Sequence, residues 1–308
     1  MLEPKEMLNM HNFRAAITVV LTLVLLSNAT AVHAGAWLIK KGKVWGQYNI
    51  KWASATKMFN AKGEKKSISG YMDGRKWQFS MLPKLEYGVT DWLNALLYMD
   101  YKEVWFKEYN RPASMGPFSH KNHGIDSIQT GAKIRIIKDP IMFTLQPKVF
   151  IYPGYGNYQQ NDPSYSNYPP IGYGDDAFEL RVLTGKELWF PASGRLDLHC
   201  YWKLESGYRW RTRHVANDIP FYACFGIWPK EWLLLNTEID SYKCAPGTGS
   251  IKESSAIWRS GIIWQVFGNS TLRQGAQMFN IEFQYGVTVW GKNTTAYNEY
   301  ILSIHSHF

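Results

Sequence analysis

Apolar and polar residues alternate along residues 195–211, which read "RLDLHCYWKLESGYRWR". One set of alternate positions, from Leu196 to Trp210, is mainly apolar and aromatic, and the other, from Arg195 to Arg211, is mainly charged. A β-strand separates two such sets onto opposite faces, whereas a helix would mix them around its circumference. The pattern therefore predicts a β-strand, and one much longer than the usual length of about 5–6 residues.

The same period of two recurs in other segments of the chain. It is clear in "KWQFSMLPKLEY" (76–87), "QTGAKIRI" (129–136) and "NIEFQYGVTV" (280–289), and weaker in "EWLLLNTEID" (231–240). In the first of these, Pro83 falls on the apolar face. Because proline cannot donate a hydrogen bond to a neighbouring strand, we expect a local bulge there.

The connections between these strands alternate in length. Short turns are expected at 87–92, 138–140, 191–194, 229–231 and 268–271. Longer polar links are expected near 57–73, 108–122, 156–173, 212–218, 243–252 and 291–296. About twelve long strands joined in this way are typical of an antiparallel up-and-down transmembrane β-barrel of the bacterial outer membrane. An even number of strands returns the chain to its starting side, so both termini are predicted to be periplasmic. The alternative is a secreted β-sandwich, whose strands would be shorter.

The N-terminal segment has the features of an export signal. A basic residue, an apolar run and a small-residue cleavage site follow one another in "FRAAITVVLTLVLLSNATAVHA". We expect residues 1–34 to be a signal peptide, cut between Ala34 and Gly35, with Met10 as an alternative start. Residues 35–308 would then form one barrel domain in the outer membrane of a Gram-negative bacterium.

Composition agrees with a membrane location. Aromatic residues make up 16% of the chain and charged residues 19%, which is below the roughly 25% of soluble domains. Tryptophan and tyrosine are stabilised at bilayer interfaces. The net charge is +9, but an exported chain without a groove-reading motif is not expected to bind nucleic acid.

The alternation also assigns the two faces of the barrel wall. A Lys or Arg at the lipid midplane would cost about 2–4 kcal/mol, so the charged faces must line the lumen. Basic residues are in modest excess among the lumen-lining candidates, which are Lys84, Glu86, Lys133, Arg135, Lys148, Glu179, Arg181, Lys203, Glu205, Arg209, Arg259 and Glu282. They could form a mutually paired filling or a narrow path with a weak preference for anions. Twelve strands allow either a small pore or a plugged lumen.

Catalytic and metal-binding sets are weak in this sequence. Ser119, His120, His123 and Asp126 have the residue types for acyl transfer and lie in or beside a predicted long loop, but no nucleophile motif accompanies them. Two of them could offer imidazoles to a metal, without an identified third ligand. We therefore expect no enzyme activity and no cofactor or metal.

The three cysteines, Cys200, Cys224 and Cys244, are too few and too irregularly spaced for a disulfide framework or a zinc site. We expect all three thiols to be free.

The chain ends "YILSIHSHF". Tyr300, Leu302, Ile304 and Phe308 share one parity, which we assign to the outward face. An aromatic residue at the end of the last strand resembles the signal that the barrel-assembly machinery recognises. His305 and His307 have the opposite parity and are expected to face the lumen.

Two stretches resemble a known family. "AGAWLIKKGKVWGQYNIKW" (34–52) and "KLEYGVTDWLNALL" (84–97) resemble the opening segments of XagA-like proteins and of proteins assigned to the MetA pathway of phenol degradation. The resemblance covers mainly the first third of the chain. It implies an outer-membrane barrel that takes part in the passage of small, often hydrophobic compounds. It carries over no binding residues.

These observations together predict a narrow channel or transporter for small solutes, with outer-membrane lipid and lipopolysaccharide around it. The alternative is a structural or interaction barrel with a plugged lumen and binding loops, such as the Tyr- and Asn-rich segment 154–174. A third hypothesis is an outer-membrane hydrolase. The Lys-rich segment 57–76 is either a solvated polar loop or attracted to phosphates of the outer leaflet.

Overall fold

The computed structural model describes residues 37–68, 74–108, 118–153, 175–190, 198–212, 215–249, 252–267 and 279–307. The expected signal peptide, its cleavage site at Ala34 and Gly35, and Phe308 lie outside these residues. Within them, no helix has the length and apolar character to cross a membrane.

The described residues form twelve long strands and one short strand. The long strands are β1 (Val44–Phe59), β3 (Arg75–Thr90), β4 (Leu93–Glu108), β5 (Phe118–Ile137), β6 (Met142–Ile151), β7 (Ala177–Phe190), β8 (Leu198–Arg211), β9 (Asp218–Lys230), β10 (Leu233–Cys244), β11 (Ser254–Phe267), β12 (Phe279–Lys292) and β13 (Thr294–His307). The short strand β2 (Lys65–Ser67) pairs with the end of β1.

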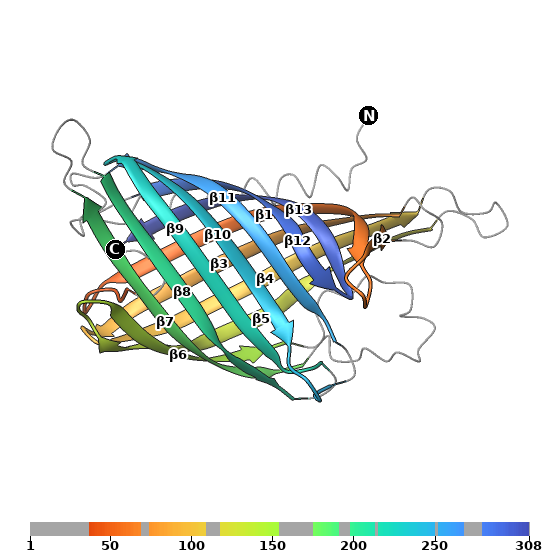
Figure 1. Ribbon diagram of the computed structural model, residues 1–308, viewed down its shortest axis with the longest axis horizontal. Coiled ribbons are helices and arrows are strands. Elements are labelled where there is room, and N and C mark those ends of the chain that lie inside the picture. Colours follow the sequence, from red (N-terminus) through yellow and green to blue (C-terminus); the bar gives the residue numbers. More distant parts are fainter. Residues whose placement is uncertain are drawn as a thin grey trace.

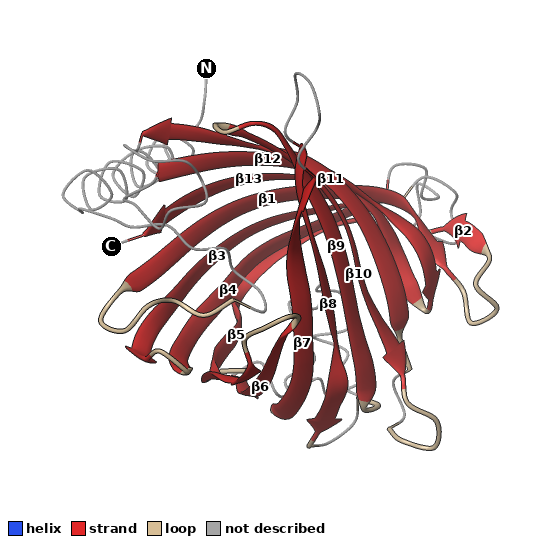
Figure 2. Ribbon diagram, turned by 60° about the vertical axis from the view of Figure 1, so that its left-hand side comes forward, coloured by secondary structure: helices blue, strands red, loops and turns tan. Residues whose placement is uncertain are grey.

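Each long strand pairs with its neighbours in the chain, and β13 pairs back onto β1, with His307 opposite Trp45 (Figure 1). The sheet is therefore a closed antiparallel barrel, which Figure 2 shows from a second direction. Closure leaves no long strand with an unpaired edge, as a hydrocarbon environment requires. The predicted fold class and the predicted strand number are confirmed.

In contrast to a soluble protein, the barrel wall buries charged side chains and exposes large apolar ones. The largest side chains with less than 2% exposure include Lys133, Glu86 and Glu179. Large apolar side chains such as Trp264 (55% exposed) and Leu97 (52% exposed) lie on the outer surface. A closed barrel produces this distribution when its outer face meets lipid and its charged face meets the lumen.

Several predicted connections are correct, and the tight turns after β3, β5 and β9 lie where the sequence places them. Two predicted links are wrong. β5 begins at Phe118, inside the predicted link 108–122. β12 and β13 are separated by Asn293 alone, which has a φ of 51° that asparagine tolerates well. The predicted turns at 191–194 and 268–271 and the predicted link 156–173 lie outside the described residues.

The predicted bulge at Pro83 is also absent. The register of β3 with β1 runs through the Tyr48–Pro83 pair without interruption, and the β3–β4 register is the same at Met81 as at Lys84. The proline therefore costs one ladder hydrogen bond without requiring an extra residue. The irregularity between β3 and β4 occurs instead between Gly88 and Thr90.

Candidate functional site

A cavity of about 490 Å³ lies inside the barrel and is lined by residues from all twelve long strands. Ten of the twelve lumen-lining candidates border it, and Glu179 lies fully buried behind the cavity surface. Arg135 does not border the cavity; its backbone N–H donates to the carbonyl oxygen of Trp92 in the turn after β3. The cavity is therefore the feature around which a functional site can be described.

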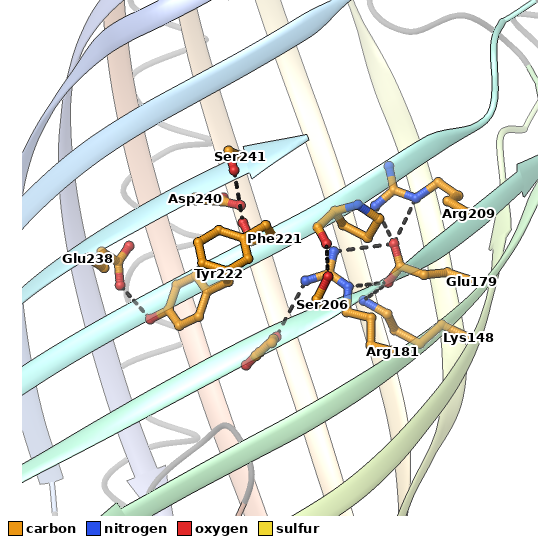
Figure 3. Close-up of polar contacts among 12 residues, drawn as sticks. Lys148, Glu179, Arg181, Ser206, Arg209, Phe221, Tyr222, Glu238, Asp240 and Ser241 are labelled. Atoms are coloured by element: carbon orange, nitrogen blue, oxygen red, sulfur yellow. Dashed lines mark hydrogen bonds and ion pairs between the residues drawn. The ribbon is translucent and has the colours of Figure 1, made fainter. Parts of the chain in front are cut away.

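The carboxylate of Glu179 on β7 contacts three cationic side chains of the barrel wall. Its oxygens lie 2.9 Å from Lys148, 2.6 Å from Arg181 and 2.6 Å from Arg209. Figure 3 shows how these side chains surround the carboxylate. Arg181 also approaches Glu205, at 3.4 Å. The cluster therefore joins three strands, β6, β7 and β8, through charge-assisted hydrogen bonds, which are stronger than those between neutral groups.

A second cluster surrounds Arg259 on β11. Its guanidinium lies 3.1 Å from Glu238, 3.3 Å from Asp240 and 2.5 Å from Glu299. Glu299 is on β13, so this contact passes across β12 at Gly286. A Cβ atom on Gly286 would lie 2.9 Å from a side-chain carbon of Arg259 and 3.0 Å from one of Glu299. The missing side chain of Gly286 therefore leaves room for the pair.

Two further carboxylates have partners on the lumen side. Glu86 is contacted by the Lys133 ammonium at 2.8 and 2.9 Å and accepts a hydrogen bond from the Tyr98 hydroxyl at 2.5 Å. Glu282 lies 2.8 Å from the Nε2 atom of His305. The structure thus gives His305 an acidic partner on β12, which the sequence of the last strand alone does not predict.

Charges along the cavity are almost balanced. Eight Lys or Arg residues and six Asp or Glu residues line it, a slight basic excess. Glu179 and Glu299, fully buried against lining arginines, compensate this excess. Asp100, Glu238 and Asp240 also line the cavity, although they are not among the lumen-lining candidates predicted from the sequence. All three have the inward parity of their strands, β4 and β10, so the alternation of apolar residues was the signal that could have found them.

The N-terminal segment before β1 enters the barrel. Leu38 and Ile39 are 4% and 3% exposed, and the Trp37 ring packs edge-on against the Tyr201 ring with 6.0 Å between centroids. A Cβ atom on Gly185, a lumen-side position of β7, would lie 3.1 Å from the Trp37 ring. Segment 37–39 therefore crosses the interior from the start of β1 toward β7 and β8.

Backbone contacts fix the base of this segment. The Gly42 N–H donates to the Gly88 carbonyl oxygen at 2.7 Å, and the Gly88 N–H donates to the Lys43 carbonyl oxygen at 2.9 Å. A Cβ atom on Gly88 would lie 2.1 Å from the Lys40 carbonyl oxygen, so this close approach requires glycine.

Apolar groups form a layer where segment 37–39 is bound. Tyr201, Cys224 and Leu234 make a buried cluster against which Trp37 and Ile263 pack. These residues come from the first part of β8, from β9 and from the start of β10, toward the end of the barrel where β1 begins and β13 ends. This end of the lumen therefore has an apolar layer beside charged contacts such as Glu86 with Lys133.

The proposed catalytic set does not assemble. Ser119, His120, His123 and Asp126 all lie in β5 rather than in a loop, because the β4–β5 ladder extends to the Glu108–Phe118 pair. Asp126 is 8% exposed and 2.5 Å from Lys102.

His123 lies opposite Glu103 in the β4–β5 ladder, and its side chain is exposed. Lys121, in contact with Glu103 and 5.2 Å from the Trp105 ring centroid, stabilises this polar stretch as a strand. Within the described part of the chain, no group of three His, Cys, Asp or Glu residues could hold a metal ion.

The remaining predicted positions are placed as follows. Tyr300 and Leu302 are 49% and 43% exposed, as outward residues of β13 should be. His305 and His307 border the cavity. All three cysteines are free, as expected.

Among known proteins, this chain is similar in fold to solved outer-membrane barrels. No family model and no curated protein matches the chain, so the resemblance to XagA-like and MetA-pathway proteins stays a prediction. The COG4313 outer membrane channel from Pseudomonas putida F1 is similar with a TM-score of 0.57 and 11% identity, over 90% of this chain and 99% of that chain.

Two other solved structures are more distant. The translocator domain of the autotransporter NalP from Neisseria meningitidis has a TM-score of 0.39 at 10% identity, over 86% of this chain and 88% of that one. The CymD monoaromatic hydrocarbon channel has a TM-score of 0.36 at 6% identity, over 87% and 88%. By its closed twelve-stranded barrel and its likeness to the Pseudomonas putida channel, the chain has the fold of Gram-negative outer-membrane barrel proteins.

Proposed function

We propose that this protein is a narrow outer-membrane channel for small solutes, with both termini on the periplasmic side. The observation that supports this proposal is the cavity of about 490 Å³ in the middle of a closed barrel. Its volume is in the range of pockets that hold small molecules, which is about 300–1,000 Å³. The Pseudomonas putida barrel of similar fold is an outer membrane channel, which agrees with the proposal.

The wall chemistry suits solutes with polar groups. The side-chain oxygens of Asn49, Asn236 and Asn280 are buried, border the cavity and accept no hydrogen bond in the structure. Buried polar atoms are normally hydrogen-bonded, so such atoms favour water or a solute as a partner. Because the lumen charges nearly cancel, we expect little selectivity between small anions and cations.

The alternative function, a structural barrel with a closed lumen, is supported by segment 37–39. Trp37, Leu38 and Ile39 occupy the interior beside the apolar layer, where a path would have to pass. In the channel proposal, this segment sets the narrowest point. In the alternative, it seals the lumen.

Single-channel recording in planar bilayers distinguishes the two functions. We expect the wild-type protein to conduct ions in small steps and Trp37→Ala to conduct more, because a large ring leaves the lumen. The control is Trp232→Ala. Trp232 lies in the turn between β9 and β10, at the same end of the barrel as segment 37–39, and its 48% exposed ring stacks on the ring of Trp264. The channel proposal fails if neither the wild type nor Trp37→Ala conducts, and the closed barrel would then be favoured.

A further inference from the structure

A second cleft, of about 260 Å³, lies at the end of the barrel opposite the N-terminal segment. Here β1 changes partners: it pairs with β3 as far as Ala55 and with β2 from Lys57 onward. β2 extends from the right-hand end of the barrel in Figure 1. We call this the basic rim cleft, because four cationic residues line it: Lys57, Lys65, Arg75 and Lys76.

The charge of the basic rim cleft differs from that of the lumen. Lumen cations such as Arg259 and Lys133 lie in contact with carboxylates. None of the ten described residues that line the cleft is Asp or Glu. The like charges of Lys57, Lys65 and Lys76 around about 260 Å³ repel one another, and a bound anion would offset that repulsion.

Other contacts position these cations and add polar groups. The Lys65 ammonium lies 5.2 Å from the Phe59 ring centroid, and the Lys76 ammonium lies 5.8 Å from the Tyr297 ring centroid. Both distances are within the range of cation–π attraction. The cleft is also lined by polar side chains that can hydrogen-bond to phosphate oxygens, namely Ser54, Thr56 and Asn298.

An aromatic cluster faces lipid next to the cleft. The Trp52 ring is 5.7 Å from the Trp105 ring and 6.4 Å from the Phe79 ring, and Trp52 is 45% exposed. Trp77 lines the cleft and pairs across the strands with Trp105, which makes the two features continuous. Tryptophans at such positions mark the level of the lipid headgroups.

From this juxtaposition we infer that the basic rim cleft binds the phosphorylated headgroup of a glycolipid in the outer leaflet, while the aromatic cluster contacts its acyl chains. Lys supplies compact charge and Arg a planar fork for phosphate oxygens. The inference rests on the proposed outer-membrane placement, with this end of the barrel facing outward. It does not require that the lumen conducts.

The chemistry favours a lipid over free phosphate. A free anion would use only the cations, whereas a glycolipid also covers the exposed Trp52 face, which no described residue covers completely. We therefore expect affinity to depend on phosphate groups and acyl chains together. The electrostatic part should weaken as salt rises from about 0.1 M to about 1 M, where the Debye length falls from about 10 Å to about 3 Å.

The test is equilibrium binding to the purified barrel in detergent micelles, with three probes: diphosphorylated lipid A, dephosphorylated lipid A and inorganic phosphate. The variant is Lys57→Gln with Lys65→Gln, both exposed and on different strands. Its matched control is Lys40→Gln with Lys41→Gln, which removes two exposed charges at the opposite end. Conductance of every variant is recorded in parallel.

We expect the Lys57/Lys65 variant to bind diphosphorylated lipid A at least about tenfold more weakly, because two charge-assisted contacts are lost. The Lys40/Lys41 control should bind it as the wild type does, and dephosphorylated lipid A should bind the wild type weakly. The inference is overturned if both double variants bind lipid A alike, or if inorganic phosphate alone binds as tightly as lipid A. If lipid A binding changes as expected but no protein conducts, the inference stands and the channel proposal fails.

Discussion

The cluster around Glu179 offers the sharpest test of how the lumen is held together. Glu179→Gln keeps the shape of the side chain but removes its negative charge, leaving the cations of Lys148, Arg181 and Arg209 near one fully buried position. Arg181 retains Glu205 at 3.4 Å, and Arg209 retains Asp218 at 3.7 Å, so neither guanidinium loses every acidic neighbour. Lys148 loses the carboxylate that lies 2.9 Å from its ammonium.

The size of the effect follows from burial. Removing one partner of a buried ion pair typically costs about 3–5 kcal/mol, because the other charge stays buried without compensation. Two of the three cations here keep longer contacts, and the lumen cavity adjoins the cluster. We therefore expect Glu179→Gln to lower the free energy of unfolding by about 3 kcal/mol, the lower end of that range.

The assay is urea unfolding of the barrel in lipid vesicles, followed by tryptophan fluorescence. Glu231→Gln makes the same chemical change at an exposed turn residue and is the control. Adding Lys148→Met to Glu179→Gln removes one excess cation and should restore part of the lost stability. The reasoning is refuted if Glu179→Gln and Glu231→Gln unfold at the same urea concentration.

Two further predictions concern orientation and assembly. A membrane-impermeant maleimide added to whole cells should label Lys62→Cys, in the link after β1, and should not label Glu231→Cys, in the turn after β9; the reverse result would place the termini outside the cell. Phe308→Ala should lower the amount of heat-modifiable barrel in the outer membrane if the last residue is an assembly signal, and unchanged levels would count against that role.

Much of the fold could be predicted because a period of two assigns faces without knowledge of strand register. Leu204 and Trp210 had to face outward and Lys203 and Arg209 inward, whichever strands lay beside them. Tight turns were predictable where Gly, Pro and Asp concentrate, as at Asp139 and Pro140. The predictions failed where polar residues belong to strands, as in the first part of β5.

The sequence by itself thus determined a closed barrel of about twelve strands and the residues on each of its faces. Only the tertiary structure decided which charges meet. Lys133 and Glu86 are 47 residues apart in the chain, and Arg259 and Glu299 are 40 apart. Such contacts depend on the register of every intervening strand and, at Gly286, on a missing side chain.

The position of segment 37–39 was likewise beyond sequence reasoning. "WLI" is equally compatible with an apolar linker or with the start of a strand. Its place inside the barrel depends on the apolar layer formed by Tyr201, Cys224 and Leu234 from three separate strands. Alternation fixes the direction of each side chain locally, whereas what a lumen contains depends on the residues that closure brings face to face.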